Sequence, residues 1–127
     1  MQGILLAFAL LGTIGSTQVK AVPLQDPHPE PEYYTVYFDA TAYDDCYSCC
    51  GKTDGITASG VKATANHTIA APPEYEFGQI IEIKGIKYVV EDRGGAIKGN
   101  HIDIFFNTHE EACAFGRQYV EGKVYYK

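Results

Sequence analysis

The sequence lacks any apolar run long enough to cross a bilayer, and it is poor in basic residues. The run Ile4–Leu11 falls far short of the roughly 18 residues that a membrane-spanning helix needs, and no other run approaches that length. Ten lysines and arginines stand against 16 aspartates and glutamates, which gives a net charge of −6. Long-range attraction to nucleic acid or to anionic lipid is therefore not expected, and we predict neither partner.

The short apolar run is typical of a secretory signal. Residues 1–21 combine it with the small-residue cleavage pattern Val19-Lys20-Ala21. A partly buried N-terminal helix is the alternative, but the polar, proline-rich segment 22–33 that follows is typical of a linker. We therefore predict a secreted, extracellular protein with one small domain at residues 34–127. Loss of residues 1–21 removes Lys20 and brings the net charge to −7.

Alternating residues rich in β-formers predict a mostly-β domain. The expected strands are residues 35–43, 62–71, 79–84, 87–91, 101–106 and 123–126. One helix is expected over residues 108–119, where Thr108 and Glu111 form a capping-box pattern. Its inward stripe is predicted to be Ala112, Phe115, Gly116 and Tyr119. A small closed barrel with one packed helix fits, because closure removes exposed strand edges.

Four cysteines lie after the predicted signal, at Cys46, Cys49, Cys50 and Cys113. An even number of cysteines in a small secreted domain predicts two disulfides. A bond between the adjacent Cys49 and Cys50 is disfavoured, so we expect Cys113 to join one of them and Cys46 the other, stapling the helix to the cysteine-rich loop. A zinc site is the alternative, because Cys46-x-x-Cys49-Cys50 has ligand-like spacing. We favour the disulfides, with no metal.

The most informative stretch is DRGGAIKGNHID, residues 92–103. Asp92 ends one apolar strand pattern and Asp103 lies inside another, where a carboxylate is costly to bury unless something binds or uses it. Upstream are the motifs TASG at residues 57–60 and TAY at residues 41–43. This combination resembles the 3D (three-aspartate) domain family over roughly residues 35–126. The resemblance implies a small six-stranded double-psi β-barrel, the fold of the catalytic domains of membrane-bound lytic transglycosylase A and of small peptidoglycan lyases.

The resemblance also implies that Asp103 is a catalytic acid. Lytic transglycosylases of this family cleave the β-1,4 bond between N-acetylmuramic acid and N-acetylglucosamine, and one carboxyl can act as acid and then as base. Asp92 is expected to support it, since a nearby negative charge raises the pKa of Asp103. The alternatives are a structural Asp103 and an Asp92 that caps the turn at Gly94 and Gly95. Glu91 is expected on the opposite strand face, in solvent.

Residues that could bind substrate surround the two aspartates. Glycines allow a sugar ring to approach the backbone closely, and Lys98 could bond a sugar N-acetyl group or a peptide carboxylate, or be an exposed turn lysine. Tyr43 is either a stacking platform for sugar or barrel core. His101 is expected on the same strand face as Asp103, two positions away. The predicted substrate-binding set is Gly94, Gly95, Lys98, Thr57, Ser59, Tyr43 and His101.

One position departs from the family pattern. The first of the three aspartates that name the family is replaced here by Pro72, and Glu74 or Glu76 is the candidate to reach the same space. Asn66-His67-Thr68 is also a glycosylation sequon, relevant to a eukaryotic source. Any polysaccharide would have to bind in a cleft, because the surface is not basic.

The sequence thus predicts a secreted, monomeric, cofactor-free enzyme that cleaves peptidoglycan, as a lytic transglycosylase or a muramidase-like variant. Two alternatives stay open. A non-catalytic, expansin-like polysaccharide-binding or wall-loosening protein is one, because residues 101–103 echo the His-Phe-Asp motif of expansins. A double-psi barrel glycoside hydrolase is the other, and it would need two opposed carboxylates.

Overall fold

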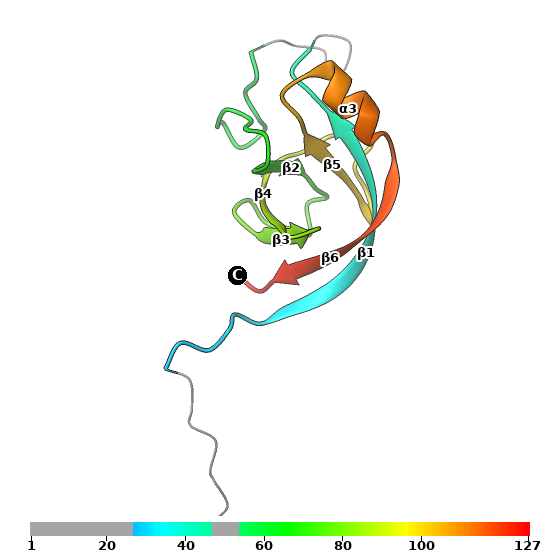
Figure 1. The fold of residues 1–127 in the computed structure, drawn as a ribbon. Coiled ribbons are helices and arrows are strands. Elements are labelled where there is room, and N and C mark those ends of the chain that lie inside the picture. The colour runs from blue at the N-terminus through cyan, green and yellow to red at the C-terminus, as the bar shows by residue number, and fades with distance from the viewer. Residues whose placement is uncertain (1–26, 47–53) are drawn as a thin grey trace, which may run out of the picture. The chain divides into compact units, whose positions relative to one another are not determined.

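Six strands close into a barrel around one hydrophobic core (Figure 1). The computed structural model describes residues 27–46 and 54–127, and residues 31–127 form one unit. The elements are β1 (Tyr33–Tyr43), β2 (Thr68–Ala70), β3 (Ile80–Ile83), β4 (Ile86–Asp92), β5 (His101–Phe105), α3 (His109–Phe115) and β6 (Gln118–Tyr125). Around the barrel the order is β1-β5-β2-β4-β3-β6. The predicted mostly-β barrel with one helix is confirmed for the described ranges.

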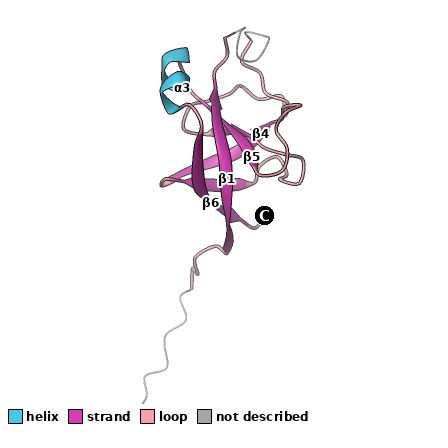
Figure 2. Cartoon of the chain, turned by 90° about the vertical axis from the view of Figure 1, so that its right-hand side faces the viewer, coloured by secondary structure: helices cyan, strands magenta, loops and turns pink. Residues whose placement is uncertain are grey.

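Strand pairing in this barrel is mixed. The pairs β1–β5 and β2–β4 are parallel, whereas β2–β5, β3–β4, β3–β6 and β1–β6 are antiparallel. The two longest strands, β1 and β6, run side by side over eight register pairs (Figure 2). Within the described residues, no helix is long and apolar enough to span a membrane.

Side-chain alternation decides which residues enter the core. In β5, Ile102 and Ile104 are buried, while His101 and Asp103 between them are only half-buried. Successive side chains of a strand point to opposite faces, so the polar pair turns away from the core. Other fully buried core residues are Phe38, Ile69, Ile81, Val90 and Val124.

The helix is shorter than predicted. Thr108 is the N-cap as expected, and its side chain accepts a hydrogen bond from the Glu111 backbone at 3.1 Å. The helix ends at Phe115 because Gly116, at φ 66°, caps it and donates its N–H to Ala112. Glycine reaches this left-handed region at little cost. The chain then enters β6 at Gln118, so the prediction that Tyr119 faces inward from the helix is wrong: Tyr119 is an exposed strand residue.

The predicted strand over residues 62–71 is also shorter, since only Thr68–Ala70 forms β2. A turn precedes it, with Asn66 at φ 61°, a conformation that asparagine tolerates better than most residues. Thr64 closes this turn: its backbone N–H donates to the Thr68 hydroxyl and its carbonyl accepts from the Thr68 N–H, both at 2.9 Å. Local polar contacts thus replace strand pairing here.

The predicted disulfide staple of the helix is not supported. Of the two cysteines in the described ranges, neither Cys46 nor Cys113 is bonded to another sulfur. Both thiols instead lie beside one imidazole, that of His109, at 3.8 Å and 3.3 Å. Cys49 and Cys50, the other members of the predicted pairs, lie outside the described residues.

Gly122 in β6 is required by close packing. A Cβ atom at this position would lie 2.6 Å from the ring of Phe38 and 3.2 Å from Ile81. We expect Gly122→Ala to lower the free energy of unfolding by about 1–3 kcal/mol, the usual cost of overpacking a core. Chemical denaturation would measure this loss. Gly95→Ala is the matched control, because nothing lies within 4 Å of its added Cβ; equal stability of the two variants would contradict the packing argument.

Candidate active site

Four residues form one row across four adjacent strands. In the register of the barrel, Thr41 of β1 lies opposite Asp103 of β5, Asp103 lies opposite Ala70 of β2, and Ala70 lies opposite Asp92 of β4. Register partners share a sheet face, so the two aspartates flank an alanine on the same side. Strand spacings of about 4.8 Å put their backbones roughly 10 Å apart. The short side chain of Ala70 leaves space between the carboxylates.

Three residues of this row, Ala70, Asp92 and Asp103, line a pocket of about 180 Å³. Seven residues contribute, from the ends of β1 and β4, from β2 and β5, and from the glycine-rich turn after β4: Tyr43, Ala70, Asp92, Arg93, Gly94, Ile97 and Asp103. A concave site with a few convergent polar groups is the usual form of a small-molecule or catalytic site. The sequence-predicted aspartates are therefore brought together in one cavity.

Asp103 is held in a state suited to proton transfer. Burial raises its pKa above the ordinary value for an aspartate, because desolvation disfavours the charged form. The hydrogen bond from the Thr41 hydroxyl, at 2.8 Å, and the nearby His101 act in the opposite direction. The negative charge of Asp92 raises the pKa further, as predicted, but burial is the largest cause.

His101 shares the hydroxyl of Thr41 with Asp103. Its Nε2 lies 2.8 Å from the Thr41 Oγ1, and its Nδ1 lies 3.2 Å from the Ala96 carbonyl. A carbonyl can only accept, so Nδ1 carries a proton. Thr41 donates to Asp103, and the lone pairs of its hydroxyl oxygen face the imidazole. The three side chains therefore form one hydrogen-bonded chain.

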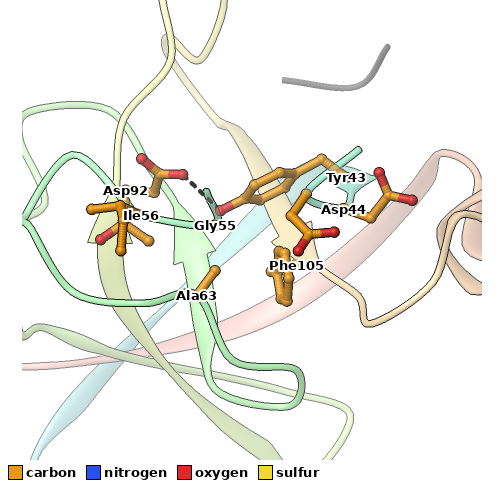
Figure 3. A pocket seen from close by; sticks show the side chains of 9 residues that line it. Tyr43, Asp44, Gly55, Ile56, Ala63, Asp92 and Phe105 are labelled. Carbon is orange, nitrogen blue, oxygen red and sulfur yellow. Dashed lines mark hydrogen bonds between the residues drawn. The ribbon is translucent and has the colours of Figure 1, made fainter. Parts of the chain in front are cut away.

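Asp92 is fixed by three donors. Its Oδ2 accepts from the Tyr43 hydroxyl at 2.7 Å, and its Oδ1 accepts from the backbone N–H groups of Ala58 and Arg93 at 2.8 and 2.9 Å. Figure 3 shows the Tyr43–Asp92 bond from close by. The Arg93 bond agrees with the turn-capping alternative for Asp92, and the shared pocket agrees with the supporting role. The two interpretations are compatible in this geometry.

The TASG motif explains the Ala58 contact. Thr57 accepts the N–H of Gly60, which stands at φ 92°, and the Thr57 hydroxyl donates to Val61 at 2.8 Å. The resulting tight turn directs the Ala58 N–H at Asp92. Ser59 contacts the Thr57 hydroxyl at 3.0 Å, so this motif holds Asp92 through the backbone.

A second, smaller pocket of about 30 Å³ lies next to the first (Figure 3). It shares Tyr43 and Asp92 with the larger pocket. Tyr43 packs edge-on against Phe105, with ring centroids 5.4 Å apart, so its ring is a half-buried wall between two cavities. The full lining is Tyr43, Asp44, Asp45, Gly55, Ile56, Thr57, Ala63, Asp92 and Phe105.

Only some of the other predicted substrate-binding residues line a pocket. Gly94 lines the larger pocket and Thr57 the smaller one. Ser59, Gly95 and Lys98 lie outside the sets that line the two pockets, and the last two are exposed.

The prediction that Glu91 stands free in solvent is wrong. Its side chain is 16% exposed; it accepts from the Thr68 hydroxyl at 2.7 Å and lies 3.2 Å from His67 Nε2. A register shift in the pairing of β2 with β4, between Ile69 and Ala70, lies at this position, and such irregularities redirect side chains.

Two residues of the site were missed from the sequence. Thr41 was noted only as part of the TAY motif, although it bridges His101 and Asp103. Arg93 lines the pocket and ties down the segment after β2, where it donates to the carbonyls of Ala71 and Tyr75 at 3.2 and 2.7 Å. The sequence signal that could have identified Arg93 was its place directly after Asp92. For Thr41 the only signal was its membership of the TAY motif.

The position of the first family aspartate is buried and holds a proline. Pro72 is fully buried, and its carbonyl accepts the N–H of Tyr75 in a turn. Glu74 and Glu76 are both exposed, and Glu76 pairs with Lys127 at 3.4 Å. Neither glutamate lines the pocket, so the hypothesis that one of them replaces the missing aspartate is not supported.

Comparison with known proteins finds a family match. The model of the 3D domain matches residues 67–126, which include both pocket aspartates. The putative cell wall shaping protein YabE of Bacillus subtilis (strain 168) is 34% identical over 90 residues, which is 67% of this chain and 21% of YabE. The chain therefore spans about a fifth of that relative.

Two solved structures resemble the fold at low similarity. MltA from E. coli has a TM-score of 0.46 and 24% identity, over 57% of this chain and 27% of MltA. A variant of the E. coli lytic transglycosylase MltA, in its apo-2 form, has a TM-score of 0.45 and 24% identity, over 54% and 26%. The chain spans about a quarter of each of these structures.

Proposed function

We propose that this protein acts on the bacterial cell wall and cleaves peptidoglycan as a lytic transglycosylase. The observation that carries the proposal is the half-buried Asp103, whose pKa is raised by desolvation, in a pocket that also holds a second carboxylate. The match to the 3D domain model supports it, as does the cell-wall role in the name of YabE. Export by residues 1–21 and a double-psi form of the barrel belong to the same proposal.

In the proposed reaction Asp103 works twice. It first donates its proton to the oxygen that joins N-acetylmuramic acid to N-acetylglucosamine, and the bond from C1 to that oxygen breaks. The carboxylate then takes the proton of the muramyl C6 hydroxyl while that oxygen bonds to C1 and closes a 1,6-anhydro ring. Asp103 ends as it began, protonated, and no water is consumed. A general acid for this step needs a pKa near the working pH, which burial favours here.

Residues bonded to Asp103, together with the second carboxylate, stabilise the charges that appear. Thr41 donates to Asp103 while it is ionised, and this bond is strongest in the charged state. His101 lies on the far side of the same hydroxyl, with its Nε2 2.8 Å from the Thr41 Oγ1. Asp92 is held rigid by Tyr43 and by backbone donors. Its fixed charge faces a transition state with positive character at C1, which such preorganised groups stabilise.

The test is mass spectrometry of purified peptidoglycan after incubation with the full chain. Anhydro-muropeptides are the expected product. New reducing ends would favour a glycoside hydrolase instead, since water would then be the attacking group. Polysaccharide binding without any product would favour the expansin-like alternative. That alternative stays open because the buried Pro72 replaces the first family aspartate.

A further inference from the structure

Three metal-ligating side chains that are not part of the aspartate row converge at the end of β1. The Asp44 Oδ2 lies 3.4 Å from the His109 Nδ1, and the Cys46 Sγ lies 3.8 Å from the same nitrogen. All three ligand atoms are within 4.8 Å of one another. Asp44 and Cys46 directly follow β1, and His109 is the first residue of α3, which packs against β1 (Figure 1). Residues 63 positions apart in the sequence therefore meet at one point.

The two separations from the His109 nitrogen match edges of a zinc tetrahedron. Zinc binds imidazole nitrogen and carboxylate oxygen at about 2.0–2.2 Å and thiolate sulfur at about 2.3 Å. At tetrahedral angles those bonds separate nitrogen from oxygen by about 3.4 Å and nitrogen from sulfur by about 3.6 Å. The observed separations are 3.4 and 3.8 Å. Nitrogen and sulfur ligands are also the ones that zinc prefers.

The other ring nitrogen of His109 has its own partner. Cys113 lies one helical turn further along α3, and its Sγ is 3.3 Å from the His109 Nε2. A proton on Nε2, donated to this sulfur, leaves the lone pair of Nδ1 directed at Asp44 and Cys46. Partners of this kind, which fix the tautomer of a ligating histidine, are typical of metal sites. Cys113 is thus a positioning residue rather than a ligand.

The carboxylate is already oriented before any metal binds. The Asp44 side chain is only 2% exposed, and its Oδ1 accepts the Cys46 backbone N–H at 3.1 Å. This bond directs Oδ2 toward the imidazole. A buried carboxylate is favourable when it meets a cation.

We propose that Asp44, Cys46 and His109 bind one zinc ion that fastens α3 to the end of β1. The ion performs the task that the sequence suggested for a disulfide, linking the cysteine-rich segment to the helix. It also fixes the residue next to Asp44, namely Tyr43, whose hydroxyl holds Asp92 in the pocket. The site is structural, and it stands independently of the proposed cleavage reaction.

The experiment measures zinc in the full chain purified with a non-chelating reductant. Elemental analysis after dialysis is expected to find one zinc per chain. Replacement by Co²⁺ is expected to give thiolate charge-transfer and tetrahedral d–d bands. His109→Gln and Cys46→Ser should each abolish stoichiometric binding, and both sites are solvent-accessible enough to tolerate the change. Cys113→Ala should weaken binding about 10–100-fold, as the loss of an orienting partner does.

His67→Gln is the matched control. His67 is another exposed histidine beside a carboxylate, Glu91, at 3.2 Å, and its replacement should leave zinc content unchanged. Zinc should raise the melting temperature of the wild type and not that of His109→Gln. Wild-type protein without zinc affinity would overturn the proposal. So would full binding in either His109→Gln or Cys46→Ser, because the ion would then lie elsewhere.

Discussion

Replacing Asp103 with asparagine is expected to lower the rate of peptidoglycan cleavage by about 10²–10⁴-fold, the usual contribution of a general acid. An amide can neither deliver the first proton nor accept the second, so the loss lies toward the upper end if one group does both. The change should leave the fold intact, because Asp103 is half-buried on the outer face of β5, opposite the core residues Ile102 and Ile104. Muropeptide release, quantified by mass spectrometry, measures the effect.

The control is Glu121→Gln, which removes one negative charge from an exposed position on β6. It separates the effect of Asp103 from that of net charge on binding to the polymer. Circular dichroism and the melting temperature should be alike in wild type and both variants. Normal cleavage by a folded Asp103→Asn protein would exclude Asp103 as the acid, and the non-catalytic interpretation would then gain support only if the wild type released no product.

Replacing Thr41 with valine is expected to slow cleavage by about tenfold or more. Thr41 donates to Asp103 at 2.8 Å, and a hydrogen bond to a charged group contributes about 1.5–3 kcal/mol. The carboxylate is more charged in the transition state than in the protonated ground state, so this contribution falls on the rate. Valine preserves the branched shape, so the strand pairing of β1 with β5 should persist.

The pH profile distinguishes this role from a structural one. The Thr41 hydrogen bond lowers the pKa of Asp103, against the larger rise caused by burial, so its removal raises that pKa. A general acid must be protonated, and activity falls as pH rises through its pKa. The alkaline limb of Thr41→Val should therefore lie at higher pH than that of the wild type. Thr41→Ser retains the hydroxyl and should restore both rate and profile; an unchanged alkaline limb in the valine variant would contradict the assignment.

Local patterns in the sequence were sufficient for much of the fold. Alternation of apolar and polar residues predicted the β-strands, and the start of the helix at Thr108 followed from its capping pattern. The end of that helix was missed because Gly116 was interpreted as part of the inward stripe, although glycine at φ 66° terminates the helix. The inward stripe and the helix-terminating glycine are both local patterns. Only the conformation of Gly116 in the structure decided between them.

The pairing of strands around the barrel could not be predicted from such local patterns. Thr41 and Asp103 are 62 residues apart, and their contact depends on β1 lying parallel to β5. No side-chain periodicity encodes which strands pair, because alternation specifies only the face that each residue occupies. The cluster of Asp44, Cys46 and His109 has the same origin. The even number of cysteines suggested a disulfide staple, but only the packing of α3 against β1 brought the imidazole of His109 to the thiol of Cys46.

The sequence alone therefore determined the family resemblance, the β-rich fold and the two aspartates of the pocket, because these rest on contiguous motifs and on short-range alternation. The tertiary structure decided the partners of those aspartates, the buried position of Pro72 and the surroundings of the cysteines. Closure of six strands brings distant segments together, and burial then shifts the pKa of Asp103 in a way that no linear pattern specifies.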